Sequence, residues 1–370
     1  MPNVIPVCLV LCVVLLPILA SASQDASDPA SEGMTLAQAL ERAHAANPDL
    51  EAARLRVQAA DARARQQGLP QNPTLSVEVE NVIGSGIYEG DDLGETTVYL
   101  TQPLEFWGKR GKRGRAAELA GTVAEAEAAV LRAHTDEAVT SAFFGVLAAQ
   151  ARENLSRERV DSLEDAGRSA EAAAARTGLE NDRAALASAR VALAIATGLE
   201  TRALPRVVGD LEETQPLPDL ETLLERDPLG SEARLWQARV EAGEAAVTYQ
   251  RALRVPDVSL SAGYRRFNEV DEQAAIFYLS VPLPLFDTNR GEVDAAGYEL
   301  DEAKLARRSA ERHWQAHVLD AHRALMSAKR EVDAHRAAET PSARRAYIDA
   351  LERYHRAQAR LHRLTARSES

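Results

Sequence analysis

The sequence predicts a mainly helical α+β fold in which long antiparallel helical hairpins accompany four amphipathic strands. Composition is the first reason, because alanine, glutamate and arginine are abundant and only 5% of the 370 residues are aromatic. Such a balance is typical of long packed helices. The second reason is a repeated stretch, 98–111 and 277–291, in which an alternating segment meets a proline and opens into a helical tract. The recurring residues are Tyr99, Leu100 and Pro103, which correspond to Tyr278, Leu279 and Pro282. This repetition indicates an internal duplication.

Charge and cysteine content exclude several classes of function. The formal net charge is -13 at pH 7, which argues against nucleic acid as a partner. Both cysteines, Cys8 and Cys12, lie before residue 20, so the remainder of the chain has neither a disulfide nor a cysteine metal site. The sequence contains no nucleophile elbow, phosphate-binding loop or paired-carboxylate motif. We therefore expect no catalytic residues, no cofactor and no enzyme activity.

The first 22 residues have the pattern of a secretory signal peptide. An apolar run at 4–19 ends in Ala20, Ser21 and Ala22, the small residues that favour cleavage. The alternative is a single membrane anchor, since no lysine or arginine precedes the run. Residues 23–33 are polar and predict a disordered leader, and 367–370 form a short tail.

The first structural repeat is expected at 34–210. Two helices begin it, and a β-hairpin follows at 73–104, where apolar and polar residues alternate. The alternating residues are Leu75, Val77 and Val79 on one face and Ser76, Glu78 and Glu80 on the other. A helical hairpin then occupies 112–198. A helix this long needs a partner helix to cover its apolar stripe, so we expect antiparallel packing.

The second structural repeat is expected at 211–366, with the same order of elements. Helices come first, a β-hairpin follows at 256–285, and a helical hairpin occupies 290–365. The helical pattern is interrupted at Pro341. A proline-bearing linker at 199–218 joins the two repeats.

Four amphipathic strands cannot close a barrel within one chain. In a bilayer every backbone polar group must be paired, so such strands must close with copies from other chains. Alternating strands of about ten residues have the length that crosses a bilayer at a tilt. The sequence therefore predicts one protomer of a shared transmembrane barrel. Three protomers would supply about twelve strands, enough for a water-filled lumen.

The junctions between strand and helix carry candidate membrane anchors. Phe106 and Trp107 lie where a strand would leave the hydrocarbon, the depth that aromatic belts occupy. The basic residues that follow, suited to lipid phosphates, are Lys109, Arg110, Lys112 and Arg113. Phe286 and Arg290 hold the matching places in the second repeat. The alternative interpretation is a soluble turn capped by a buried tryptophan.

Three segments carry a resemblance to a known family. The run at 102–113, Gln-Pro-Leu-Glu-Phe-Trp-Gly-Lys-Arg-Gly-Lys-Arg, resembles the end of the second strand in TolC-type outer-membrane efflux factors. Residues 282–291 resemble the second junction of that family, and 354–361 resemble its closing helix. The likeness is greatest to the branch that serves heavy-metal pumps of the cobalt–zinc–cadmium type.

The resemblance implies a homotrimeric channel without catalytic activity. Its barrel would lie in the lipid of the outer membrane, and its helices would extend through the periplasm to an adaptor protein and an inner-membrane efflux pump. The function favoured by the sequence is therefore export, of divalent heavy-metal cations in particular. Two alternatives are an exported soluble coiled-coil adaptor or scaffold, and an exported enzyme.

Two sets of residues could contact cations. His313 and His317 lie one helical turn apart, a spacing that can hold Zn²⁺ or Cu²⁺, although polar residues on a solvated helix face have the same pattern. Glu78 and Glu80 would face the lumen if the apolar face of their strand meets lipid. The acidic residues near them are Glu89, Asp91, Asp92 and Glu95. Together they predict a pore that attracts cations, and ordinary solvation of a polar strand face is the alternative.

The helical hairpins look short beside those of the family. Residues 176–178 resemble the first hairpin tip, yet only about twenty residues separate them from Gly198. Equal legs would place the first turn at 154–168 instead, and Pro341 is expected to form the second turn because proline cannot continue a helix. These features predict a shortened channel homologue that inserts into the membrane without transport competence.

Overall fold

The computed structural model describes residues 33–82, 85–86, 94–225, 230–269, 271–337 and 339–365. The chain divides into two compact units, Met1–Gly33 and Met34–Ser370, and all the described helices and strands belong to the second. The expected signal peptide at 1–22, the leader up to residue 32 and the tail lie outside the described residues. The same is true of the acidic loop residues Glu89, Asp91 and Asp92.

The first repeat begins with two helices that share one capping residue. Helix α1 (Leu36–Ala46) starts at Thr35, which forms a capping box with Gln38. Helix α2 (Pro48–Gln67) starts at Asn47, whose side chain accepts hydrogen bonds from the first backbone amides. Four further elements follow in the order β1 (Thr74–Glu80), β2 (Glu95–Leu104), α3 (Lys109–Asp165) and α4 (Ser169–Thr197).

The second repeat has the same order of elements. A 3-10 turn, η2 (Thr201–Ala203), and helix α5 (Leu220–Glu225) lie in the connection. The remaining elements are α6 (Ser231–Leu253), β3 (Val258–Phe267), β4 (Glu272–Ser280), α7 (Arg290–His335) and α8 (Pro341–Thr365). The sequence prediction of a mainly helical fold with a small antiparallel sheet is confirmed.

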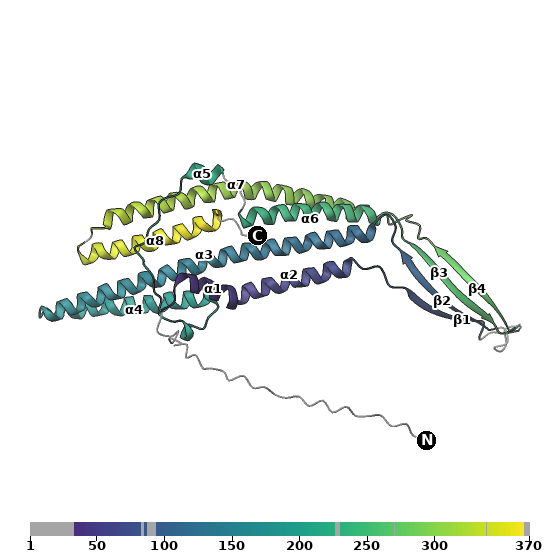
Figure 1. The fold of residues 1–370 in the computed structure, drawn as a ribbon, viewed down its shortest axis with the longest axis horizontal. Helices are drawn as coiled ribbons and strands as arrows, with labels where there is room; N and C mark the ends of the chain where they lie inside the picture. Colours follow the sequence, from purple (N-terminus) through teal and green to yellow (C-terminus); the bar gives the residue numbers. More distant parts are fainter. Residues whose placement is uncertain are drawn as a thin grey trace, which may run out of the picture. The chain divides into compact units, whose positions relative to one another are not determined.

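Each long helix is covered by two shorter helices placed end to end. Figure 1 shows α4 and α2 lying along α3, and α8 and α6 lying along α7. The 57 residues of α3 extend about 85 Å, and the 29 residues of α4 together with the 20 of α2 nearly match that length. The long helices therefore have complete partners, although neither partner is a single helix.

The first hairpin turn lies within 154–168, the range predicted from legs of equal length, and not at the segment that resembles the family's tip. Residues 176–178 lie inside α4, and the turn instead falls at Ala166, Gly167 and Arg168, with a positive φ at Gly167. The second turn lies directly before Pro341, as predicted. Helix α2 covers the part of α3 that α4 does not reach, so α3 and α4 need not match in length.

The four strands form one antiparallel sheet in the order β1-β2-β3-β4. The central pair, β2 and β3, joins the two repeats over ten residue pairs from Glu95–Phe267 to Leu104–Val258. Within the part of the chain that the structure describes, β1 and β4 each pair on one side only. Strand β4 ends at Ser280 and not at 285, since Pro282 and Pro284 cannot donate to a ladder.

Each repeat has its own apolar core, and the linker contacts both. The first core lies among α1, α3 and α4 and the second between α7 and α8. Representative members are Val139, Phe143, Leu193, Val318, Leu325 and Leu351. In the linker, Val207 forms a parallel bridge with Met34, and the Tyr354 hydroxyl donates to the Gln215 carbonyl over 2.9 Å. The linker thus holds α8 beside the start of the first repeat.

We predict that Gly198→Ala destabilises the helical part by about 1–3 kcal/mol. Gly198 ends α4 with φ +72°, and an added Cβ would lie 2.6 Å from the Ala46 carbonyl oxygen. Gly178→Ala is the matched control, because Gly178 lies within α4 and a Cβ there meets nothing within 4 Å. The control should be neutral or gain about 0.5–1 kcal/mol. Thermal melts followed by far-UV circular dichroism compare the two, and equal midpoints would contradict the prediction.

Candidate functional site

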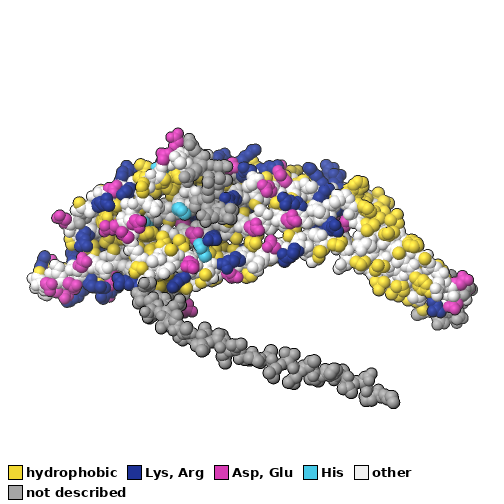
Figure 2. All heavy atoms as spheres, viewed as in Figure 1, with side chains coloured by type: hydrophobic (Ala, Val, Ile, Leu, Met, Phe, Trp, Pro, Cys, Tyr) yellow, Lys and Arg dark blue, Asp and Glu magenta, His cyan; other side chains and the backbone are white. Residues whose placement is uncertain are grey.

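One face of the sheet is apolar and open to the surroundings. Register and alternation place on this face residues from all four strands: Leu75, Val77, Val79, Val98, Leu100, Leu260, Tyr264, Phe277 and Leu279. All of them are exposed. Figure 2 shows apolar side chains gathered over the sheet, whereas charged side chains are spread over the helices. A continuous exposed apolar surface of this kind is typical of a membrane or protein contact.

The opposite face of the sheet is polar. Glu78 and Glu80 lie on it, as the sequence predicts from their alternation with Leu75, Val77 and Val79. Thr97 and Ser261 are buried on the same face, and the rings of Tyr99 and Tyr278 pack edge to face with centroids 5.7 Å apart. One side of the sheet therefore suits hydrocarbon and the other suits water.

Arg265 of β3 lies at the centre of the charged groups on the polar face. The sequence patterns described above did not single it out. Its guanidinium lies 2.8 Å from a Glu95 carboxylate oxygen and 3.3 Å from a Glu80 carboxylate oxygen. Its Nε donates to the Thr97 hydroxyl over 2.9 Å. The sequence does contain a pattern that could have indicated Arg265. Arg265 and Arg266 are the only basic residues of the four described strands, and alternation places only Arg265 on the polar face.

The first junction exposes its aromatic residues. Trp107 is 71% exposed, and Phe106 beside it is also exposed. Positive φ angles at Trp107 and Gly108 turn the chain so that α3 begins at Lys109. The alternative of a buried tryptophan capping a turn is therefore wrong.

The basic residues of this junction divide into buried and exposed groups, which corrects the expectation that all of them meet lipid phosphates. The Lys109 side chain is only 3% exposed, and its ammonium lies 2.6 Å from the Asp257 carboxylate just before β3. Arg113 is held by Glu105 and donates to the carbonyls of Gln67 and Leu69. Hydrogen bonding to Glu105 raises the pKa of Arg113. Arg110 remains exposed and available for lipid.

The second junction keeps both of its predicted residues at the surface. Phe286 is 98% exposed, and the Arg290 side chain is exposed at the start of α7. Asn289, with φ 55°, donates to the Gln250 carbonyl over 2.8 Å and so fixes the start of α7 against the end of α6. Arg113 does the same in the first repeat by bonding to the end of α2. The two junctions therefore use different side chains, Arg113 and Asn289, to hold the start of the long helix against the preceding helix.

The histidine pair on α7 lies at the surface. His313 and His317 are both exposed, with ring centroids 6.2 Å apart. Within the described ranges, no group of three or more His, Cys, Asp or Glu side chains is placed to hold a metal ion. None of the described helices is both long and apolar enough to cross a membrane.

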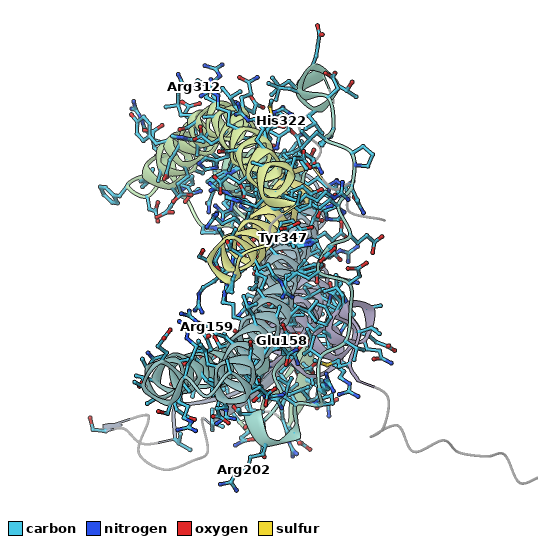
Figure 3. The ribbon with its side chains drawn as sticks, turned by 90° about the vertical axis from the view of Figure 1, so that its left-hand side faces the viewer. Glu158, Arg159, Arg202, Arg312, His322 and Tyr347 are labelled. Carbon is cyan, nitrogen blue, oxygen red and sulfur yellow. The ribbon has the colours of Figure 1, made fainter. Side chains whose placement is uncertain are left out.

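Ion pairs join the two helical hairpins away from the sheet. Arg152 of α3 contacts Asp349 over 2.7 Å and also Glu352, both on α8. Arg345 of α8 binds Asp182 of α4 through two nitrogens, and this hydrogen bonding lowers the pKa of Asp182. Figure 3 views the hairpins along their helices, with Glu158 of α3 and Tyr347 of α8 labelled. Glu158 and Arg344 of α8 add a contact of 3.3 Å.

Comparison with known proteins agrees with these features. The family described as outer membrane efflux protein matches residues 39–206 and 222–356. The cobalt-zinc-cadmium resistance protein CzcC of Cupriavidus metallidurans is 29% identical over 296 residues, which cover 73% of this chain and 68% of that protein. Among solved structures, a membrane protein from Pseudomonas aeruginosa has a TM-score of 0.71 at 20% identity, covering 90% of this chain and 93% of the other. The MtrE outer membrane channel of Neisseria gonorrhoeae in its open state has a TM-score of 0.70 at 15% identity, covering 89% of this chain and 88% of the other.

We predict that Lys109→Met destabilises the junction by about 1–3 kcal/mol, because it leaves Asp257 without its cation. The loss is smaller than for a fully buried pair, since water reaches part of Asp257. Arg110→Met is the matched control, because Arg110 is exposed on the next residue of the same helix. Thermal dissociation of purified trimers on gels measures the difference. A Lys109→Met trimer as stable as the Arg110→Met trimer would show that the pair contributes nothing.

Proposed function

The chain belongs to the outer membrane efflux protein family, and from this membership we propose that it forms the outer-membrane subunit of an export system for divalent heavy-metal cations. The family acts in transport and is not an enzyme family, so the exported enzyme is no longer a competing interpretation. The interpretation as a soluble periplasmic adaptor is also set aside, since members of this family are outer-membrane proteins.

The observation that carries the proposal is a sheet with one exposed apolar face, whose outer strands β1 and β4 each pair on one side only among the described residues. Unpaired backbone groups cost several kcal/mol each in hydrocarbon, so β1 and β4 require partners. In a homotrimer, β4 of one protomer pairs with β1 of the next, and three sheets close a barrel of about twelve strands. The apolar face then meets lipid and the polar face lines a lumen.

The exposed junction residues fit the periplasmic rim of this barrel. Trp107 and Phe286 lie at the ends of β2 and β4, at the side of the sheet from which the helices extend. Their rings suit the interface between hydrocarbon and water, and Arg110 and Arg290 follow them at the depth of lipid phosphates. In contrast, Lys109 and Arg113 act inside the protein.

The proposed cargo and partners rest on the relatives and on carboxylates of the polar face, such as Glu78. CzcC is named as a cobalt, zinc and cadmium resistance protein, and its likeness to this chain favours divalent cations as cargo. Glu78 is exposed on the polar face and would attract cations. The far ends of the helical hairpins, at 166–168 and 336–340, are the surfaces we assign to a periplasmic adaptor coupled to an inner-membrane pump.

We predict that Trp107→Ser combined with Phe286→Ser lowers the amount of trimer in the outer membrane, because both rings would lose their interfacial site. Arg110→Gln combined with Arg290→Gln should have a smaller effect, since each exposed arginine contributes only about 1 kcal/mol at a charged surface. Fractionation of membranes followed by gels without heating measures trimer content. Wild-type levels of the Trp107→Ser and Phe286→Ser trimer would contradict the placement of the rim.

We also expect the chain to restore resistance to cobalt, zinc or cadmium in a strain that has the adaptor and pump but lacks its own outer-membrane factor. This differs from the expectation based on unequal helix lengths, because α3 and α7 each have a full set of partner helices. Growth at increasing metal concentration is the measurement, and the Trp107→Ser and Phe286→Ser variant is the control. Correct trimers without resistance would favour the shortened homologue that lacks transport competence.

A further inference from the structure

The polar face of the sheet has an unequal distribution of charge. Among the described strand residues, register and alternation place four carboxylates on this face and one guanidinium, that of Arg265. The carboxylates are Glu78, Glu80, Glu95 and Glu272. The neighbouring Arg266 points to the opposite face and pairs with Asp271 at 2.9 Å. Counting acidic residues alone therefore overstates the negative charge of the lumen.

Two of the four carboxylates are opposed to each other and need a cation. Glu80 and Glu95 are direct cross-strand partners, and like charges in this position destabilise a sheet. The Arg265 guanidinium contacts both carboxylates, at 3.3 and 2.8 Å, and bonds to Thr97 between them. A planar guanidinium with several N–H donors suits this bridging position.

Glu78 has no such compensation within the described part of the chain. It lies two residues from Glu80 on the same face of β1, about 7 Å along the strand, and its cross-strand partner is Thr97. Among the described residues, no hydrogen bond or ion pair involves the side chain of Glu78, and the same is true of Glu272 on β4. Glu78 and Glu272 therefore each contribute a full negative charge, whereas Glu80, Glu95 and Arg265 together contribute one.

We propose that Arg265 limits the cation selectivity of the pore by offsetting one of the two negative charges of Glu80 and Glu95, while Glu78 and Glu272 keep their full charge and draw cations into the lumen. This inference rests on the proposed channel function. In a trimer the arrangement occurs three times around the lumen. Loss of three positive charges should favour cations, and loss of the paired carboxylates should favour anions.

The test is the reversal potential of purified trimers in a planar lipid bilayer across a KCl gradient. Arg265→Gln should raise the ratio of cation to anion permeability by roughly two- to tenfold at low salt, since unit charges near a wet pore interact by modest energies. The double variant Glu80→Gln and Glu95→Gln should lower that ratio, because Arg265 then stands unpaired. Glu78→Gln should lower it too. All shifts should shrink at about 1 M salt, where the Debye length falls to about 3 Å.

Arg266→Gln is the matched control, because it removes the same charge from the next residue on the other face of β3. Its reversal potential should equal that of the wild type. Equal behaviour of Arg265→Gln and Arg266→Gln would overturn the proposal, as would shifts in the same direction for Arg265→Gln and the glutamate pair. If Arg265→Gln trimers do not form, the sign of the glutamate-pair shift decides. Wild-type trimers without conductance would instead refute the channel function itself.

Discussion

The structure depends on one constraint, which is that backbone groups in hydrocarbon must be paired. The sheet satisfies it at β2 and β3, where the two repeats meet over ten residue pairs. The described residues leave it unsatisfied at β1 and β4. In water such a sheet exposes its apolar face, and in hydrocarbon it leaves the backbone groups of its edges unpaired. The strands therefore favour closure with further copies. The helices need no such closure to satisfy their own backbone.

The helical part follows a different rule, in which apolar stripes must be covered along their whole length. Helix α3 is covered by α4 over one part and by α2 over the other, and α7 is covered by α8 and α6. In the first repeat α2 and α4 together cover α3, and in the second α6 and α8 together cover α7. Because the chain enters the sheet from α2 and returns through α3, the junctions at Arg113 and Asn289 tie each entry helix to its long helix.

Local periodicity explains what could be predicted from the sequence. The two faces of β1 follow from alternation over a few residues, and the end of α4 follows from Gly198, whose φ of +72° suits glycine. The requirement for equal legs placed the first turn within 154–168, but the sequence could not fix its residues, because it does not show that α2, distant along the chain, supplies part of the partner for α3. The roles of Lys109 and Arg265 were missed for the same reason, since Asp257 and Glu80 approach them only in the folded sheet.

The charged contacts explain why the two repeats, despite their duplication, are not interchangeable. Lys109 with Asp257, Arg265 with Glu80 and Arg152 with Asp349 each join one repeat to the other. None of these pairs is formed within a single repeat. A partly buried ion pair adds little net stability, yet leaving one member unpaired is costly. Such pairs therefore penalise any arrangement that sets the first repeat beside another first repeat. Apolar packing along alanine-rich helices is permissive, so these charge pairs add specificity to the contact between the two repeats.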